Sequence, residues 1–212
     1  DNRIGTTKKG NGPAYRDKYS RNGKRAEDVP ELKEYIVDLY EELHNHPNVN
    51  VLFEGAQGFG LDIDWGDYPY VTSSHCTSAA ALLNGVPPQA VNKIWGVAKA
   101  YETYVGAKHF QPDESVFNDI RDIGEEYGAT TGRPRQCNWM SWNLIEKAIN
   151  INGVTDLVFN KMDVLSELGS WAILKDGEKR IFSSENMMQE WILSNLKDKE
   201  INVYFSGDKE KI

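Results

Sequence analysis

The chain has 212 residues, of which 40% are hydrophobic and 26% charged, and its formal net charge is −8 at pH 7. The sequence contains no apolar run near the roughly 20 residues that a membrane-spanning helix needs, and no signal-peptide pattern at its start, so we expect a cytoplasmic protein that binds no membrane. The net negative charge argues against a general nucleic-acid-binding protein, because affinity for the phosphate backbone requires basic surface.

The first 25 residues are rich in glycine and basic side chains. Gly5, Gly10, Gly12 and Pro13 predict a loop that faces a ligand, followed by a short helix from about Ala14. The basic residues of this segment indicate either a binding site for a phosphorylated small molecule or a surface that faces solvent. They are Lys8, Lys9, Arg16, Lys18, Arg21, Lys24 and Arg25.

The next segment is predicted to be a helix followed by a strand. Asp28 and Pro30 open the helix, whose apolar residues recur at helical spacing until Pro47 ends it near His46. Residues 49–53 are predicted to form a buried strand that runs into a glycine-spaced turn carrying Gln57. The Gln57 amide can satisfy a purine edge or a phosphate oxygen, although a tight turn with Gln57 facing water is an equal alternative.

Residues 70–74 are predicted to be extended and end in hydroxyl side chains, which suit phosphate binding or, more commonly, helix capping. Helices and strands then alternate, which indicates an α/β fold and a single domain over residues 1–212. The predicted helices are 78–83, 87–94, 113–127, 141–150 and 184–196, and the predicted strands lie within 95–105 and at 155–159, 171–175, 178–182 and 201–205. Cys76 and Cys137 stand far apart, and we expect free thiols.

A loop between Gly128 and Arg135 combines hydroxyl groups with two guanidinium groups. Arginine is suited to a bidentate grip on carboxylate or phosphate, and Gly132 allows the backbone to approach a ligand. The loop therefore predicts a site for a small anion. The alternative is a polar surface loop whose arginines make exposed ion pairs of little energetic value.

Residues 160–163 follow the predicted strand at 155–159 and read Asn, Lys, Met, Asp. Ligands of open α/β sheets bind at the carboxyl ends of the strands. An Asn-Lys-x-Asp run at that position is typical of guanine recognition, in which the carboxylate accepts from the base and the lysine stem covers it. The run is short, so a simple strand-ending turn is an equal alternative.

Several of these segments, in this order, resemble the adenylosuccinate synthetase family from Ile4 to about Leu165. The similar segments are residues 4–15, the long stretch 53–74, the loop 130–135, and Lys161 with Asp163. The resemblance implies a P-loop-NTPase-like adenylosuccinate synthetase fold, α/β, with a mostly parallel central sheet flanked by helices and with its N-terminal part missing. It implies a purine-nucleotide ligase that converts IMP, L-aspartate and GTP to adenylosuccinate, GDP and phosphate with Mg²⁺, and that works as a homodimer.

The resemblance also implies roles for individual residues. Substrate IMP would contact Thr7, Gln57 and Thr72, with Gln57 also taking part in catalysis, and Arg21 would reach the IMP of a neighbouring subunit. Val105 would line the ribose, and GTP would contact Arg135, Lys161, Asp163 and Gly207. Aspartate would be held by Thr130, Thr131 and Arg135, with Arg133 bridging ligands nearby. No metal ligand is assigned in this chain, because the Mg²⁺ ligands are expected mainly in the missing N-terminal part.

Some residues depart from the family pattern and leave alternatives open. Lys8 stands in place of Gly, Asp67 in place of Thr and Gln136 in place of a third basic residue, and residues 106–110 also differ. One alternative is a compact archaeal-like or virus-encoded relative that acts on a 2-amino or deoxy purine monophosphate. Another is a non-catalytic nucleotide-binding or dimerisation fragment, since no phosphate loop with its Asp precedes Ile4. A GTPase-like switch protein is a weaker alternative, because it would have no use for the arginine loop.

Overall fold

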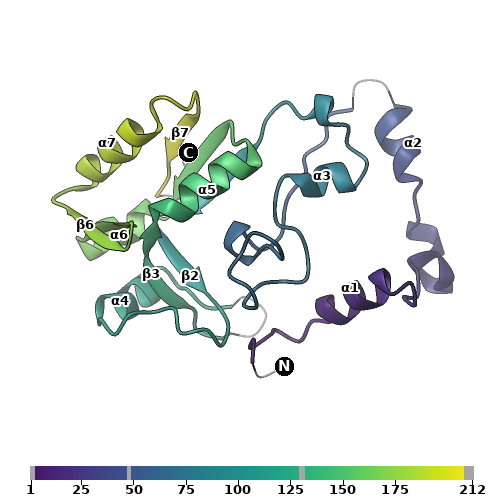
Figure 1. The fold of residues 1–212 in the computed structure, drawn as a ribbon, viewed down its shortest axis with the longest axis horizontal. Helices are drawn as coiled ribbons and strands as arrows, with labels where there is room; N and C mark the ends of the chain where they lie inside the picture. Colours follow the sequence, from purple (N-terminus) through teal and green to yellow (C-terminus); the bar gives the residue numbers. More distant parts are fainter. Residues whose placement is uncertain (1–2, 47–48, 129–131, 208–212) are drawn as a thin grey trace. The chain divides into compact units, whose positions relative to one another are not determined.

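The structure is a computed structural model that describes residues 3–46, 49–128 and 132–207. It divides into two compact units, one formed by Asp1–Thr6 with Lys93–Ile212 and the other by Thr7–Asn92. Figure 1 shows the elements of both units. Within the described residues no helix is long and apolar enough to cross a membrane.

A three-stranded parallel sheet forms one half of the Lys93–Ile212 unit. Its strand order is β1 (Trp95–Lys99), β4 (Asp156–Asn160) and β7 (Asn202–Phe205). The first four residues of the central strand β4 are buried, as expected for an apolar strand with a partner on each side. Because all three strands run the same way, their carboxyl ends meet at one edge.

A four-stranded mixed sheet forms the other half of this unit. Its order is β2 (Tyr101–Tyr104), β3 (Gln136–Ser141), β5 (Trp171–Lys175) and β6 (Glu178–Phe182). The central pair, β3 and β5, is parallel, and the two outer pairs are antiparallel. The predicted hairpin at 171–182 is confirmed: Asp176 and Gly177 have φ values of 53° and 81°, as a two-residue hairpin turn requires.

Four helices pack with these sheets around one core (Figure 1). Helix α4 (Val116–Ile123) packs on β3 and on α6 (Met162–Leu168), and both α5 (Trp142–Asn152) and α7 (Glu185–Leu196) pack on β5. Capping side chains define the starts of α5 and α7, where Ser141 and Ser184 accept hydrogen bonds from the backbone N–H of Leu144 and Met187. The apolar faces of α4 and α7 are buried, which confirms the helices predicted there.

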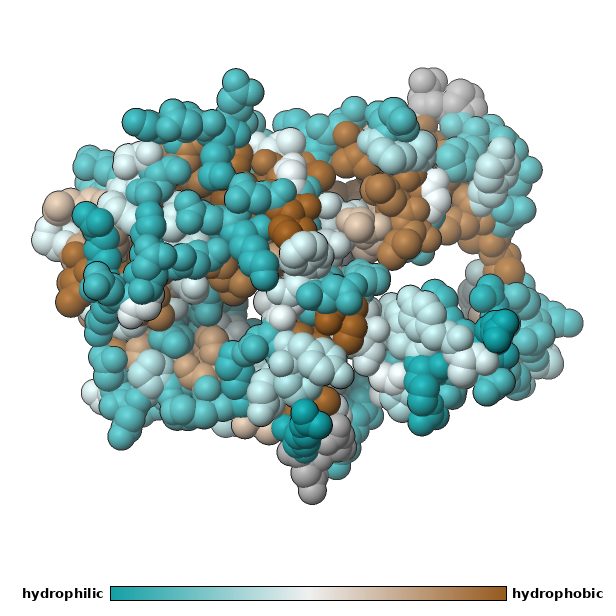
Figure 2. Space-filling view, viewed as in Figure 1, coloured by the Kyte–Doolittle hydropathy of each residue, from teal (hydrophilic) through white to brown (hydrophobic). Residues whose placement is uncertain are grey.

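The Thr7–Asn92 unit has short helices joined by long irregular segments. They are α1 (Asn11–Tyr19), α2 (Leu39–His44), α3 (Ala79–Leu83) and the 3-10 turns η1 (Ala26–Asp28), η2 (Pro30–Tyr35), η3 (Phe59–Leu61) and η4 (Pro88–Ala90). Asp62 is the one buried residue among those described in this unit. Figure 2 shows hydrophobic residues at the surface over the part that carries α2 and α3, where Leu39, Tyr40, Leu82 and Leu83 are exposed.

Several sequence-based predictions are wrong in detail. Residues 49–53 form no strand and Leu52 is 90% exposed, because the described part of this unit offers no strand to pair with. The single helix predicted over 30–46 is divided by the extended backbone at Ile36 and Asp38. The strand predicted within 95–105 divides at the fully buried Ala100 into β1 and β2. Strand β3 and helix α6 were not predicted.

The predicted fold class is confirmed by the same structure. The strands of the Lys93–Ile212 unit form three parallel and two antiparallel pairs, with helices packed against them. The two thiols are also free, as expected, with Cys137 buried and Cys76 partly exposed.

Candidate functional site

The carboxyl edge of the parallel sheet carries the side chains predicted to read a guanine base. Lys161 follows β4 with φ 63°, a left-handed conformation that turns the chain directly into α6 and places Asp163 in that helix's first turn. Asp163 is exposed. Gly207 follows β7 at the same edge, and a Cβ at this position would lie 2.9 Å from the Asp163 backbone nitrogen. The structure therefore brings Lys161, Asp163 and Gly207 together, and the close approach explains the glycine.

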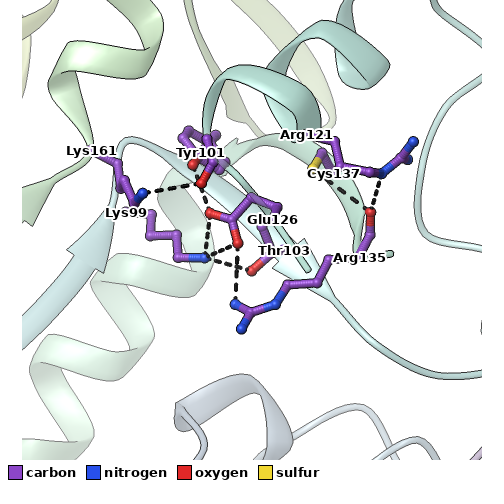
Figure 3. A network of polar contacts seen from close by, with 9 residues as sticks. Lys99, Tyr101, Thr103, Arg121, Glu126, Arg135, Cys137 and Lys161 are labelled. Atoms are coloured by element: carbon purple, nitrogen blue, oxygen red, sulfur yellow. Dashed lines mark hydrogen bonds and ion pairs between the residues drawn. The ribbon is translucent and has the colours of Figure 1, made fainter. Parts of the chain in front are cut away.

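A buried carboxylate, Glu126, organises the basic side chains near this edge (Figure 3). Its Oε1 and Oε2 accept hydrogen bonds from Lys99 Nζ at 2.7 and 2.8 Å, and Oε1 accepts another from the Tyr101 hydroxyl at 2.7 Å. Arg135 Nη1 lies 3.2 Å from Glu126 Oε2. Lys99 also donates to Thr103 Oγ1 at 3.0 Å. Elements distant in the sequence thus meet at one carboxylate.

The electrostatics of this cluster keep Glu126 ionised. Burial by itself would raise the pKa of Glu126, but hydrogen bonds from Lys99 and Tyr101, together with the charges of Lys99 and Arg135, lower it below its ordinary value. Burial lowers the pKa of Lys99 despite the opposing effect of Glu126, and the charges of Arg135 and Lys161 lower it further. Two cationic side chains, Lys99 and Arg135, pair with the one carboxylate, and Lys161, which donates to the Gly124 carbonyl at 3.1 Å, adds a third positive charge nearby. The surplus of positive charge suits an anionic ligand.

The predicted anion-binding loop begins and ends beside this cluster. Its two arms are held together by a bridge between Tyr127 and Pro134, and Arg135 N–H donates to the Glu126 carbonyl at 2.9 Å. Arg133 donates to the carbonyl of Gly5 at 3.1 Å and to that of Gly106 at 3.3 Å. The predicted aspartate ligands Thr130 and Thr131 lie outside the described residues.

Gln136, which takes the place of a third basic residue in the family pattern, fixes the segment before α4. Its Oε1 accepts from the backbone N–H of Phe110 at 2.9 Å, and its Nε2 donates to the carbonyl of Lys108 at 2.7 Å. Val105, the predicted ribose contact, follows β2 and is partly buried. The neutral amide suits this position because it can donate to and accept from the backbone at once.

The remaining predicted IMP contacts lie in the Thr7–Asn92 unit. Gln57 is exposed and has a φ of 64°, and Arg21 is exposed with a φ of 62°. Thr72 donates its backbone N–H to the Leu61 carbonyl at 2.8 Å, and Thr7 is exposed. The IMP contacts expected of these residues stay predictions.

One group among the described residues has metal-binding side chains close together. Donor atoms of Asp62, Asp64 and His75 lie within 4.8 Å of one another. Both oxygens of Asp62 already accept backbone hydrogen bonds, from Asp64 and Trp65 at one oxygen and from Cys76 at the other. Mg²⁺ favours an all-oxygen octahedral shell, so this group, with its imidazole and its occupied carboxylate, does not fit that ion.

Lys99, Tyr101 and Glu126 were missed by the sequence analysis. The signal was weak but present: Lys99 ends an apolar strand pattern, and Glu126 is a charged residue separated from the Gly128–Arg135 loop by Tyr127 alone. Neither carries a recognisable motif, and only tertiary packing brings them within hydrogen-bonding distance.

Comparisons with known proteins identify relatives of this chain. The sequence model described as adenylosuccinate synthetase matches residues 29–176. The adenylosuccinate synthetase of Fusobacterium nucleatum is 37% identical, and the match covers 95% of this chain and 58% of that protein. That of Xanthomonas oryzae pv. oryzae is 41% identical, covering 76% of this chain and 49% of that protein. The chain spans about half the length of the curated relatives it matches.

Solved structures give the same result for the fold. Fully ligated adenylosuccinate synthetase from Plasmodium falciparum superposes with a TM-score of 0.73 at 26% identity, over 94% of this chain and 67% of that one. Succinoaminodeoxyadenylate synthetase of cyanophage S-2L, bound to dGMP and dATP, gives a TM-score of 0.68 at 21% identity, over 97% of this chain and 59% of that one. The predicted α/β fold, with a parallel sheet flanked by helices, is therefore confirmed.

Proposed function

Because the chain belongs to the adenylosuccinate synthetase family, we propose that it forms part of a ligase that joins L-aspartate to IMP while GTP is converted to GDP and phosphate. The observation that carries this proposal is the edge of the Lys93–Ile212 unit, where Asp163 and Gly207 lie together and Lys99 interacts with the charges of Arg135 and Lys161. An exposed carboxylate suits the hydrogen-bond donors of guanine, and the cations suit anionic oxygens.

The proposed reaction has two steps. The 6-oxygen of IMP takes the γ-phosphoryl group of GTP and GDP leaves; the amine of aspartate then attacks C6, and phosphate leaves with the oxygen. Positioning and charge stabilisation supply most of the catalysis in such transfers. In this scheme Asp163 accepts from the guanine N1 and exocyclic amine, the Lys161 stem covers the base, and Arg135 binds aspartate and contacts GTP.

The other predicted contacts belong to the same proposal. Thr7, Gln57 and Thr72 contact IMP, and Gln57 assists catalysis through its amide. Val105 lines the ribose, and aspartate is held by Thr130, Thr131 and Arg133 in addition to Arg135. Arg21 reaches the IMP of a neighbouring subunit, so the working form is a homodimer. The left-handed backbone at Gln57 and the exposure of Gln57 and Arg21 support roles in contact with ligands.

The cofactor and location follow from the family by analogy. We propose Mg²⁺ as the metal that accompanies GTP, with ligands outside the described residues, and a cytoplasmic enzyme of purine biosynthesis. The group formed by Asp62, Asp64 and His75 does not fit Mg²⁺, and the proposed reaction does not involve it.

An assay of phosphate release tests the proposal. The ligase of which the chain forms part is expected to release phosphate from GTP only when both IMP and L-aspartate are present. Arg135→Leu is expected to raise KM for aspartate by about tenfold or more, because a charge-assisted contact of roughly 1.5 to 3 kcal/mol is lost. Unchanged aspartate affinity in this variant would remove Arg135 from the site, and no release under any condition would favour a non-catalytic fragment.

The choice of nucleotide is tested separately. Asp163→Asn is expected to weaken binding of GDP far more than of ADP, because the amide presents a donor where guanine also donates. Asp119→Asn on α4, also exposed, is the matched control and should change neither. Turnover of dGMP in place of IMP, or use of dATP as the donor, would identify the chain instead as a synthetase for a 2-amino, deoxy purine monophosphate, like the cyanophage protein.

A further inference from the structure

Glu126 is a buried charge that the proposed reaction does not use. Its residue is 3% exposed, and among the described residues only Asp62 and Asp156 are comparably buried charged groups. Burying a carboxylate is costly unless it is paired and hydrogen-bonded. Glu126 meets both conditions through Lys99, Tyr101 and Arg135.

The contacts of Arg135 are unevenly distributed around its guanidinium group. Nη1 is paired with Glu126 at 3.2 Å, whereas the buried Nε has no hydrogen-bond partner within the part of the chain that the structure describes. The side chain is 31% exposed. A buried N–H without a partner costs free energy unless an acceptor reaches it. An anionic oxygen of a bound ligand is such an acceptor.

The backbone alone does not determine where the guanidinium points. Hydrogen bonds hold the Arg135 main chain, since its N–H donates to the Glu126 carbonyl and its carbonyl accepts from Arg121 Nε at 2.6 Å. The long side chain still has several rotatable bonds beyond that point. Glu126 is the described group that fixes its far end, and the same Oε2 also accepts from Lys99 at 2.8 Å, so the carboxylate bridges the two positive charges (Figure 3).

We propose that Glu126 is a positioning residue for Arg135: by pairing with Nη1 it holds the guanidinium so that Nε is left for an anionic oxygen of the ligand. This inference rests on the proposed function for the identity of that ligand, which is either the carboxylate of aspartate or an oxygen of GTP. Without the carboxylate, Lys99 and Arg135 would face one another as like charges, and the guanidinium would turn toward solvent.

A measurement without ligand tests the positioning directly. In the full chain, the Arg135 Nε–H resonance, assigned by its loss in Arg135→Lys, is expected to exchange slowly with solvent. In Glu126→Gln it should exchange at least about tenfold faster, because the ion pair that orders the group is gone. Tyr101→Phe is the matched control: it removes another hydrogen bond to Glu126 but leaves the pair with Arg135, and slow exchange should persist. Slow exchange in Glu126→Gln would overturn the proposal.

A double-mutant cycle on steady-state kinetics then links positioning to the ligand. Glu126→Gln is expected to raise KM for aspartate or for GTP by about tenfold with a smaller change in kcat, and to add less than about twofold in an Arg135→Leu background. Whichever KM changes identifies the ligand. Equal effects in both backgrounds would show a structural role for Glu126 and overturn the inference. Unchanged KM values in Arg135→Leu alone would instead contradict the proposed function, and the two failures are thus distinguishable.

Discussion

The two units of the chain contain similar side chains but bury them very differently. In the Lys93–Ile212 unit a contiguous core includes Trp142, Phe159 and Ile192, none of which is exposed. In the Thr7–Asn92 unit the large apolar residues Leu52, Tyr35 and Leu83 are between 70% and 90% exposed. The difference is the sheets: strands give apolar residues a surface on which to pack, and the described part of the Thr7–Asn92 unit has none.

The first and largest test of this comparison is a pair of truncations. Phe159→Ala in β4 is expected to lower the free energy of unfolding by about 3 to 5 kcal/mol, because a fully buried ring leaves a cavity. Leu52→Ala is the counterpart in the other unit and should change it by less than about 0.5 kcal/mol. Denaturant unfolding measures both. Similar losses would show that Leu52 is buried in the working protein.

The second test concerns Asp62, which is the one buried residue among those described in the Thr7–Asn92 unit. Its carboxylate accepts backbone hydrogen bonds from Asp64 and Trp65 at one oxygen and from Cys76 at 2.6 Å at the other. Asp62→Ala should therefore speed amide hydrogen exchange in residues 62–76. The increase should correspond to a loss of about 2 kcal/mol in the local free energy of unfolding. Asp64→Asn, whose side chain is 68% exposed, is the control and should have little effect.

The same carboxylate predicts an acid sensitivity. Burial alone would raise the pKa of Asp62, but the three backbone hydrogen bonds and His75 lower it below the ordinary 3.8. Its stabilising contribution is therefore fully present above pH 3.8 and is lost as the pH falls through the lowered pKa. Protection factors for residues 62–76 should fall in that range in the wild type and not in Asp62→Asn, and equal pH dependence would exclude Asp62 as the cause.

The smallest effect compares one cysteine from each unit. Burial raises the pKa of the Cys137 thiol to about 11, and it also raises the pKa of Cys76, which is partly exposed. Cys76 should therefore react with iodoacetamide at least about tenfold faster in the native protein, because the thiolate is the reacting form and access is required. Mass spectrometry of Cys76→Ser and Cys137→Ser resolves the two rates. Faster labelling of Cys137 would mean that its core opens readily.

Motifs with local physical causes were predictable from sequence. The hairpin around Asp176 and Gly177, the helix that Ser184 caps and the strand before Asn160 all follow from residues near one another in the chain. The predicted strand at 49–53 failed for the converse reason, since an apolar run becomes a strand only where a partner strand exists. Helix α6 was missed because the left-handed turn at Lys161 starts a helix without a capping side chain.

By itself, the sequence determined the α/β class, the family, and the side chains at the carboxyl end of β4, because each depends on short-range pattern or on several motifs in a fixed order. Only the tertiary structure decided that Lys99, Tyr101 and Arg135 share the buried Glu126, and that Gly207 lies against Asp163. Such contacts join residues distant in the chain. A buried charge is stable only when packing brings oppositely charged and hydrogen-bonding groups from other elements into contact with it.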